Sequence, residues 1–114
     1  MSIQSFKELV VWQKSMDVAV CAYAVCDKLP RQESYGIISQ IQRSAVSIAS
    51  NIAEGQQRNS PKEFKQFLGI ARGSAAELET QLLLVNKVYG IDTAECLQIL
   101  HEVQKMLSVL QSKL

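Results

Sequence analysis

The sequence predicts an all-α protein, an antiparallel up-down-up-down four-helix bundle in which residues 1–114 form a single domain. Three observations lead to this prediction. Apolar residues recur every three or four positions in four long segments. Only two prolines and five glycines interrupt the chain, in which 47% of the residues are hydrophobic and 20% are charged. The connections between the segments are short, so consecutive helices are expected to lie side by side in opposite directions.

The first helix is predicted over residues 8–28. Pro30 ends it, because proline lacks an amide donor and disfavours helical geometry in the residue before it. A turn over residues 29–34 then leads to the next segment. The core face is expected to hold the apolar residues that follow one another at intervals of three and four, which are Leu9, Trp12, Met16, Ala19, Tyr23 and Cys26.

The second helix carries an apolar stripe with the same spacing, formed by Ile38, Ile41, Ala45, Ile48 and Ile52. Gly55 follows the last of these positions. We expect it to end the helix in the left-handed conformation, which glycine adopts without a steric penalty. Residues 56–59 are predicted to form a polar loop.

The third and fourth helices have clear start signals. Ser60 is expected to cap the third helix, with Pro61 in the first turn and Glu63 completing a capping box. Gly90 ends that helix, and Asp92-Thr93 repeats the capping pattern before the fourth. The two expected core stripes are Phe64, Leu68, Ala71, Ala75, Leu78, Leu82 and Val85, followed by Leu100, Val103, Leu107, Leu110 and Leu114.

Three further valines stand on the first helix, away from its expected core face. Val11, Val18 and Val25 recur every seven residues. Single exposed valines are common, whereas a sustained line more often marks a subunit contact. We therefore predict that these valines contact another copy of the chain in a homo-oligomer, with scattered surface valines as the alternative.

The cysteines and the hydropathy indicate a reduced, cytoplasmic protein that does not enter a membrane. Cys21, Cys26 and Cys96 are an odd number, and no basic and apolar leader precedes them. Cys21 and Cys26 are about 140° apart around a helix, unlike a CxxC metal or redox pair, so we expect buried structural thiols. No apolar run approaches the roughly 20 residues of a membrane span.

Polar side chains follow a line beside the core stripe of the second helix, and Lys65, Arg72 and Glu79 stand seven apart on the third. Gly69 and Gly73 form a GxxxG spacing, which lets a neighbouring backbone come close. Polar groups buried between helices need one another as partners. We predict a structural network that fixes helix register or a subunit boundary and includes Ser47, Asn51, Glu54, Arg72, Ser74 and Glu77.

The alternative, a catalytic or ligand site built on Glu54, Arg72 and Glu77, is disfavoured. His101 is the single histidine, and Glu102 beside it in sequence does not share its helix face. The HExxH, Walker and paired Glu-x-x-His patterns are absent. We therefore predict no enzymatic activity, no cofactor and no metal site, and a histidine at the surface.

A local excess of positive charge is the second functional candidate. Residues 43–72 have a net charge of +3, five cations minus Glu54 and Glu63, whereas the whole chain has +1. Aromatic platforms for stacking bases are nearly absent there. A solvated loop and helix start is the alternative interpretation. The candidate phosphate contacts are Arg43, Arg58, Lys62, Lys65 and Arg72.

Several motifs in roughly the first 90 residues resemble one bacterial family. They are LVVWQK at residues 9–14, YGI at 35–37, QIQRSAVSI at 40–48, SNIAEG at 50–55 and ARGSxxELETQL at 71–82. In this order and spacing they resemble the 23S ribosomal RNA intervening-sequence proteins, which are four-helix bundles. The resemblance implies a homopentameric ring with no established activity, and it supplies no catalytic residues.

The fold is also similar to that of the accessory protein of diversity-generating retroelements. That protein forms a basic pentameric barrel and works with nucleic acid and a reverse transcriptase, whereas this chain is nearly neutral. We expect a non-enzymatic homo-oligomeric scaffold, a pentamer by resemblance, that binds structured RNA or DNA weakly. A protein–protein interaction module without nucleic-acid binding is the alternative.

Overall fold

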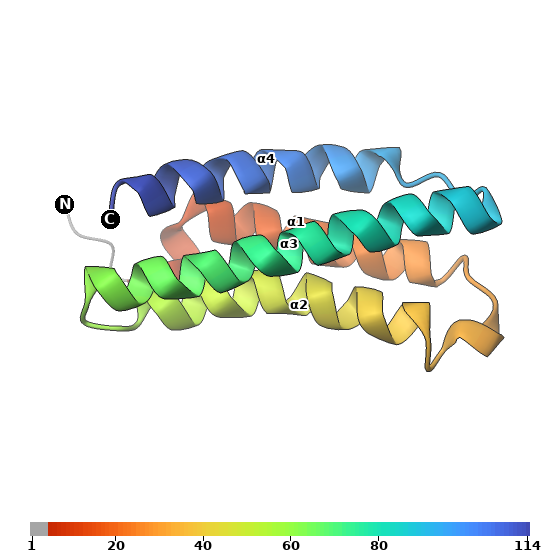
Figure 1. Cartoon of the computed structure of the whole chain (residues 1–114), viewed down its shortest axis with the longest axis horizontal. Helices are drawn as coiled ribbons and strands as arrows, with labels where there is room; N and C mark the ends of the chain where they lie inside the picture. The colour runs from red at the N-terminus through yellow and green to blue at the C-terminus, as the bar shows by residue number, and fades with distance from the viewer. Residues whose placement is uncertain (1–4) are drawn as a thin grey trace.

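The structure, a computed structural model, describes residues 5–114 and contains four long helices that alternate in direction (Figure 1). They are α1 (Val10–Cys26), α2 (Ile37–Gln56), α3 (Pro61–Tyr89) and α4 (Ala94–Ser112). Two short 3-10 helices, η1 (Phe6–Glu8) and η2 (Arg31–Glu33), precede α1 and α2, and residues 5–114 contain no strand. The prediction of an all-α, up-down-up-down four-helix bundle is confirmed. None of these helices has the length and apolar character needed to cross a bilayer.

The longest helix, α3, sets the length of the molecule. Its 29 residues span about 43 Å at 1.5 Å per residue, close to the longest extent of 46 Å. At its start, the Ser60 hydroxyl accepts a hydrogen bond from the Glu63 backbone N–H at 3.3 Å. At its end, Gly90 has a φ of 66°, in the left-handed region. Both ends of α3 therefore lie where the sequence predicts them.

All four helices contribute to one core between them. At the end of α3, the Tyr89 hydroxyl donates a hydrogen bond to the Glu33 carboxylate, which ties this end to η2. Cys26 and Cys96 are buried in the core, and Cys21 is partly buried. The largest fully buried apolar side chains of α2, α3 and α4 are Ile41, Ile48, Ile52, Leu68, Leu78, Leu82, Leu100 and Leu107.

The buried face of α1 corrects the prediction made for its valines. Val11, Val18 and Val25 are only 5%, 0% and 4% exposed, so they belong to the core of the subunit and the predicted subunit contact through them is wrong. Ser15 and Ala22 complete this face, and the Ser15 hydroxyl donates to the Val11 carbonyl at 2.7 Å. A serine satisfied by its own helix can occupy a core position.

The larger side chains of this segment, which the sequence predicts to be in the core, lie at the edge of the core or at the surface. Met16 is 43% exposed and Tyr23 is 44% exposed, while Leu9, Trp12 and Ala19 are partly buried. The two apolar stripes of α1 overlap in sequence. The one with small side chains is buried because it can lie between the neighbouring helices without leaving gaps.

The prediction that Gly55 ends α2 is wrong, because this glycine lies inside the helix. The helix continues to Gln56, and among the described residues only Gly90 has a positive φ. A Cβ atom at Gly55 would lie 2.6 Å from the Cβ of Phe67 and 3.0 Å from a ring carbon of Phe64. The glycine is needed here because α2 and α3 approach closely, not because the chain turns.

Alanine substitutions at two glycines test this explanation. We expect Gly55→Ala to lower the free energy of unfolding by about 1–3 kcal/mol, because the added methyl group overlaps Phe67. Gly73→Ala is the matched control: a Cβ there meets nothing within 4 Å, and alanine favours a helix over glycine by about 1 kcal/mol. Urea denaturation measures both changes. Equal stability of the two variants would contradict the close approach at Gly55.

Candidate functional site

A polar groove runs between α3 and α4. It has a volume of about 520 Å³ and is lined by Gly69, Arg72, Gly73, Ala76, Gln104 and Gln111. The α3 side of the groove has three small residues in its lining, and the space above Gly73 is open. The GxxxG pair therefore leaves room for a groove at Gly73, while a Cβ on Gly69 would come within 3.2 Å of the Gln111 side chain.

Arg72 and Gln111 close one end of this groove. The Arg72 guanidinium donates to the Gln111 side-chain oxygen at 2.7 Å, and the Gln111 amide donates to the backbone carbonyl of Lys65 at 3.0 Å. A guanidinium has five N–H donors in a planar fork. Because Arg72 is exposed, its charge faces solvent while one of its donors is held by α4.

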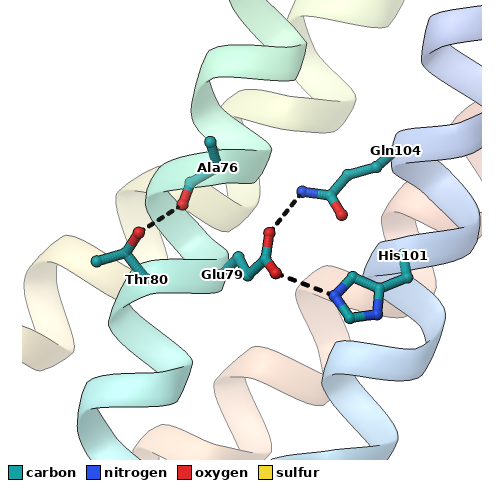
Figure 2. Close-up of polar contacts among 5 residues, drawn as sticks. All are labelled: Ala76, Glu79, Thr80, His101 and Gln104. Carbon is teal, nitrogen blue, oxygen red and sulfur yellow. Dashed lines mark hydrogen bonds and ion pairs between the residues drawn. The ribbon is translucent and has the colours of Figure 1, made fainter.

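Glu79 does not line the groove but contacts Gln104, which does (Figure 2). Its carboxylate accepts a hydrogen bond from the Gln104 amide at 3.1 Å, and its second oxygen lies 3.1 Å from Nε2 of His101. These bonds, first that from Gln104 and then that with His101, lower the pKa of the Glu79 carboxyl group. Thr80 donates to the Ala76 carbonyl on its own helix and takes no part in this contact with α4.

Together these contacts form a line of side chains, which we call the α3–α4 seam: Lys65, Arg72 and Glu79 from α3 with His101, Gln104 and Gln111 from α4. The predictions did not include Gln104 or Gln111. A signal for them exists, because both glutamines stand seven residues apart, the same spacing as their partners on α3.

The predicted polar network forms only in part. The Ser47 and Ser74 hydroxyls are hydrogen-bonded at 2.8 Å across α2 and α3. The Asn51 amide donates to the backbone carbonyl of Ser47 at 2.8 Å and to its hydroxyl at 2.9 Å. These three side chains, partly or fully buried, form a small network between the two helices.

The three charged members predicted for that network lie elsewhere, so this part of the prediction is wrong. Glu54 is exposed and pairs with Arg58, four residues later, at 3.3 Å. Arg72 faces α4 rather than α2. Glu77 is exposed and makes no side-chain hydrogen bond or ion pair within residues 5–114. Charged side chains remain at the surface because burying them would cost more than their pairing returns.

The five candidate phosphate contacts do not form one patch. Arg43 lies roughly 20 Å along α2 from the α2–α3 loop. Arg58, in that loop, pairs with Glu54 and lies 5.0 Å from the centre of the Phe67 ring. Lys62, Lys65 and Arg72 remain, all exposed in the first half of α3. The strongest cationic surface is therefore smaller than the sequence indicates.

The residues of the seam offer hydrogen-bonding groups and exposed positive charge. Both oxygens of Glu79 are engaged, and the lowered pKa makes its carboxylate a weak base. Within the described part of the chain, no group of three or more histidine, cysteine, aspartate or glutamate side chains could hold a metal ion. The exposed arginine and lysines of α3 suit an anion such as phosphate.

Comparisons with known proteins agree on one family. A family model described as 23S rRNA-intervening sequence protein matches residues 7–112. A crystal structure of a protein with unknown function from the S23 ribosomal protein family of Bacteroides thetaiotaomicron VPI-5482 is 31% identical, with a TM-score of 0.74. The match covers 89% of this chain and 98% of that one. No curated protein sequence matches the chain.

The seam predicts a pH-dependent contribution of Glu79 to stability. Because its pKa is lower in the folded protein than in the unfolded chain, this contribution is present above the unfolded-state pKa and is lost as the pH falls through the folded-state pKa. We expect Glu79→Gln to be less stable than the wild type near neutral pH. The expected difference is below about 1 kcal/mol, since the side chain is 34% exposed.

Thermal unfolding at a series of pH values measures this difference, which should shrink to nothing in acid. Glu77→Gln, on the exposed face of the same helix, is the matched control and should have no effect. An equal loss in both variants, or a difference that persists in acid, would contradict the role given to the seam.

Proposed function

The chain belongs to the family of 23S rRNA-intervening sequence proteins, and from this membership we propose that it is a cytoplasmic, non-enzymatic scaffold. In this proposal, copies of the chain assemble into a ring of five, as the family resemblance implies, and the ring binds structured RNA or DNA weakly. Apolar surface on α1 and α4 supports the self-assembly, and the cations of α3 support the binding.

The observation that carries the proposal is an apolar groove between α1 and α4, about 520 Å³ in volume. Val10 and Val109, on its two sides, are 55% and 54% exposed. Exposed apolar surface of this kind commonly marks an interaction site. The groove is lined by Leu9, Val10, Val11, Lys105, Met106, Val109, Leu110 and Lys113.

The outward face of α1 is a complementary surface for this groove. Val20 is 70% exposed and lies beside the exposed Met16 and Tyr23. At 100° per residue, Asp17 and Asp27 share this face. The face is apolar and acidic, whereas the groove is apolar with two lysines in its lining.

We therefore propose that the outward face of α1 in one copy packs into the groove of the next. A head-to-tail contact between two different surfaces generates a ring when the rotation closes. This contact takes the place of the one predicted through the buried valines.

Nucleic-acid binding is supported by Lys62, Lys65 and Arg72. Lys65 and Arg72 lie on the edge of α3 that contacts α4, Lys62 lies one turn before Lys65, and all three are exposed. One copy supplies few phosphate contacts, but a ring repeats them, so that weak contacts add through multivalency. The net charge of +1 favours the alternative of a protein–protein interaction module that binds no nucleic acid.

Light scattering combined with charge reversal tests the self-assembly. The wild type is expected at five times the 12.7 kDa subunit mass. We expect Lys105→Glu with Lys113→Glu, and separately Asp17→Lys with Asp27→Lys, to dissociate the ring, because each places like charges across the contact. All four substitutions in one chain should restore it.

Lys87→Glu, exposed near the end of α3, is the control and should leave the mass unchanged. A monomeric wild type at micromolar concentration would overturn the assembly itself. An oligomer that survives both reversals would overturn only the contact surfaces.

A salt titration with a structured RNA hairpin tests the binding. We expect Lys62→Ala, Lys65→Ala and Arg72→Ala together to weaken the affinity and flatten its dependence on salt, since each lost phosphate contact removes roughly 0.9 from the logarithmic slope. Arg43→Ala, far along α2, is the control and should change neither quantity. If the wild type binds no hairpin even at low salt, the interaction module is favoured instead.

A further inference from the structure

Two of the three cysteines lie against each other between the first and last helices. Cys21 is on α1 and Cys96 is in the first turn of α4. The Cys96 thiol donates to the backbone carbonyl of Val18 at 3.9 Å, one turn before Cys21. Sequence spacing does not reveal this pair, because the two residues are distant along the chain.

A small cavity lies beside both cysteines. It has a volume of about 160 Å³, and its lining includes Cys21, Cys96, Lys28, Asp92 and Glu95. Cys21 is partly exposed, whereas Cys96 is 1% exposed. The charges around the cavity have both signs, so a small uncharged molecule can enter without a large electrostatic cost.

We propose that Cys21 and Cys96 are a thiol pair that a hydroperoxide such as hydrogen peroxide oxidises to an intramolecular disulfide between α1 and α4. The proposal rests on the cavity that both side chains line and on the position of Cys96 against the turn of α1 that precedes Cys21. It is independent of the self-assembly and of the nucleic-acid binding proposed above.

Cys21 reacts first because it is the accessible member of the pair. Its thiol releases a proton, and the sulfur attacks the O–O bond of the hydroperoxide, giving a sulfenic acid on Cys21 and one water molecule. The Cys96 sulfur then attacks the Cys21 sulfur. The S–S bond forms, the S–O bond breaks, and hydroxide leaves with the Cys96 proton as a second water molecule. In sum, two thiols and one hydrogen peroxide give one disulfide and two waters.

Burial, together with the neighbouring Cys21 side chain, raises the pKa of the Cys96 thiol. Cys96 is therefore the weaker nucleophile toward an oxidant in solution, and it attacks only the sulfenic acid held beside it, where its proton passes to the leaving hydroxide. Its part is to resolve the sulfenic acid that forms beside it. The order of the two steps follows from the exposure of Cys21 and the burial of Cys96.

Cys26 is close in sequence to Cys21 but takes no part. Its thiol faces α2, where it donates to the Ile38 carbonyl at 3.9 Å, and it does not line the cavity. Burial, with a smaller effect of the Asp27 carboxylate, raises the pKa of the Cys26 thiol to about 11. Cys26 is therefore the matched internal control for the pair.

The crosslink would connect two helices that no loop joins. Consecutive helices are tethered by the short connections of the chain, whereas α1 and α4 are held together by packing and by the exposed ion pair of Lys14 with Glu102 at 3.0 Å. A Cys21–Cys96 disulfide would close the bundle covalently at the end opposite the α2–α3 loop (Figure 1).

The test treats the full-length, reduced protein with hydrogen peroxide and quenches it with an alkylating agent. We expect an intact mass two hydrogens lower before alkylation, one alkylated cysteine instead of three, and a peptide map that links Cys21 to Cys96 at least tenfold more often than to Cys26. Cys26→Ala should give the same crosslink at a similar rate. Cys21→Ser and Cys96→Ser should each give none.

Three results would overturn the proposal. They are a folded wild type that gains only sulfinic acid on Cys21, a crosslink between chains rather than within one, and a product that involves Cys26. Circular dichroism of each variant before oxidation identifies any loss of folding. Should Cys96→Ser fail to fold, Cys96→Ala provides the same comparison, because alanine keeps the position apolar.

Discussion

The close approach of α2 and α3 is the constraint on which the rest of the structure depends. Because Gly55 has no Cβ atom, which would overlap Phe67, the two backbones can lie close together near the α2–α3 loop. Further along, the Ser47 and Ser74 hydroxyls meet at 2.8 Å, which two such short side chains achieve only between closely spaced helices. This pair has the most extensive contact of any two helices in the described residues, and α1 and α4 pack against it.

The helix α4 is held in a different way from α2. Its buried face, with Leu100, Val103 and Leu107, supplies the apolar burial. Its polar contacts with α3 are made by long, partly exposed side chains, and hydrogen bonds of that kind contribute little net stability. They do fix how α4 is rotated and shifted along α3. Because long side chains make the bonds of the seam and Gly73 has no side chain to fill the space between the helices, an open groove remains rather than a packed contact.

Local chemistry explains which parts of the fold could be predicted from the sequence. The cap at Ser60 and the end of α3 at Gly90 depend on a few neighbouring residues, and both were predicted. The buried face of α1 was not, because Ser15 interrupts the apolar stripe in sequence while its hydroxyl is satisfied by the helix itself. The role of Gly55 likewise depends on Phe67 of another helix. Periodicity shows that a face exists, but packing decides which of two faces is buried.

The candidate site was harder to predict, for a related reason. Local charge counting groups Arg58 with Lys62 and Lys65, yet Glu54 lies one helical turn before Arg58 and offsets its charge. The seam needs two helices at once, so neither Arg72 nor Gln111 indicates it alone. The same holds for Cys21 and Cys96, which only the tertiary fold brings together. In the proposed ring, Lys105 and Lys113 face the acidic side of the next copy, so the cations left for a phosphate backbone are those of α3. A nearly neutral chain can therefore present a basic edge, because assembly uses the charges of one surface and leaves those of another free.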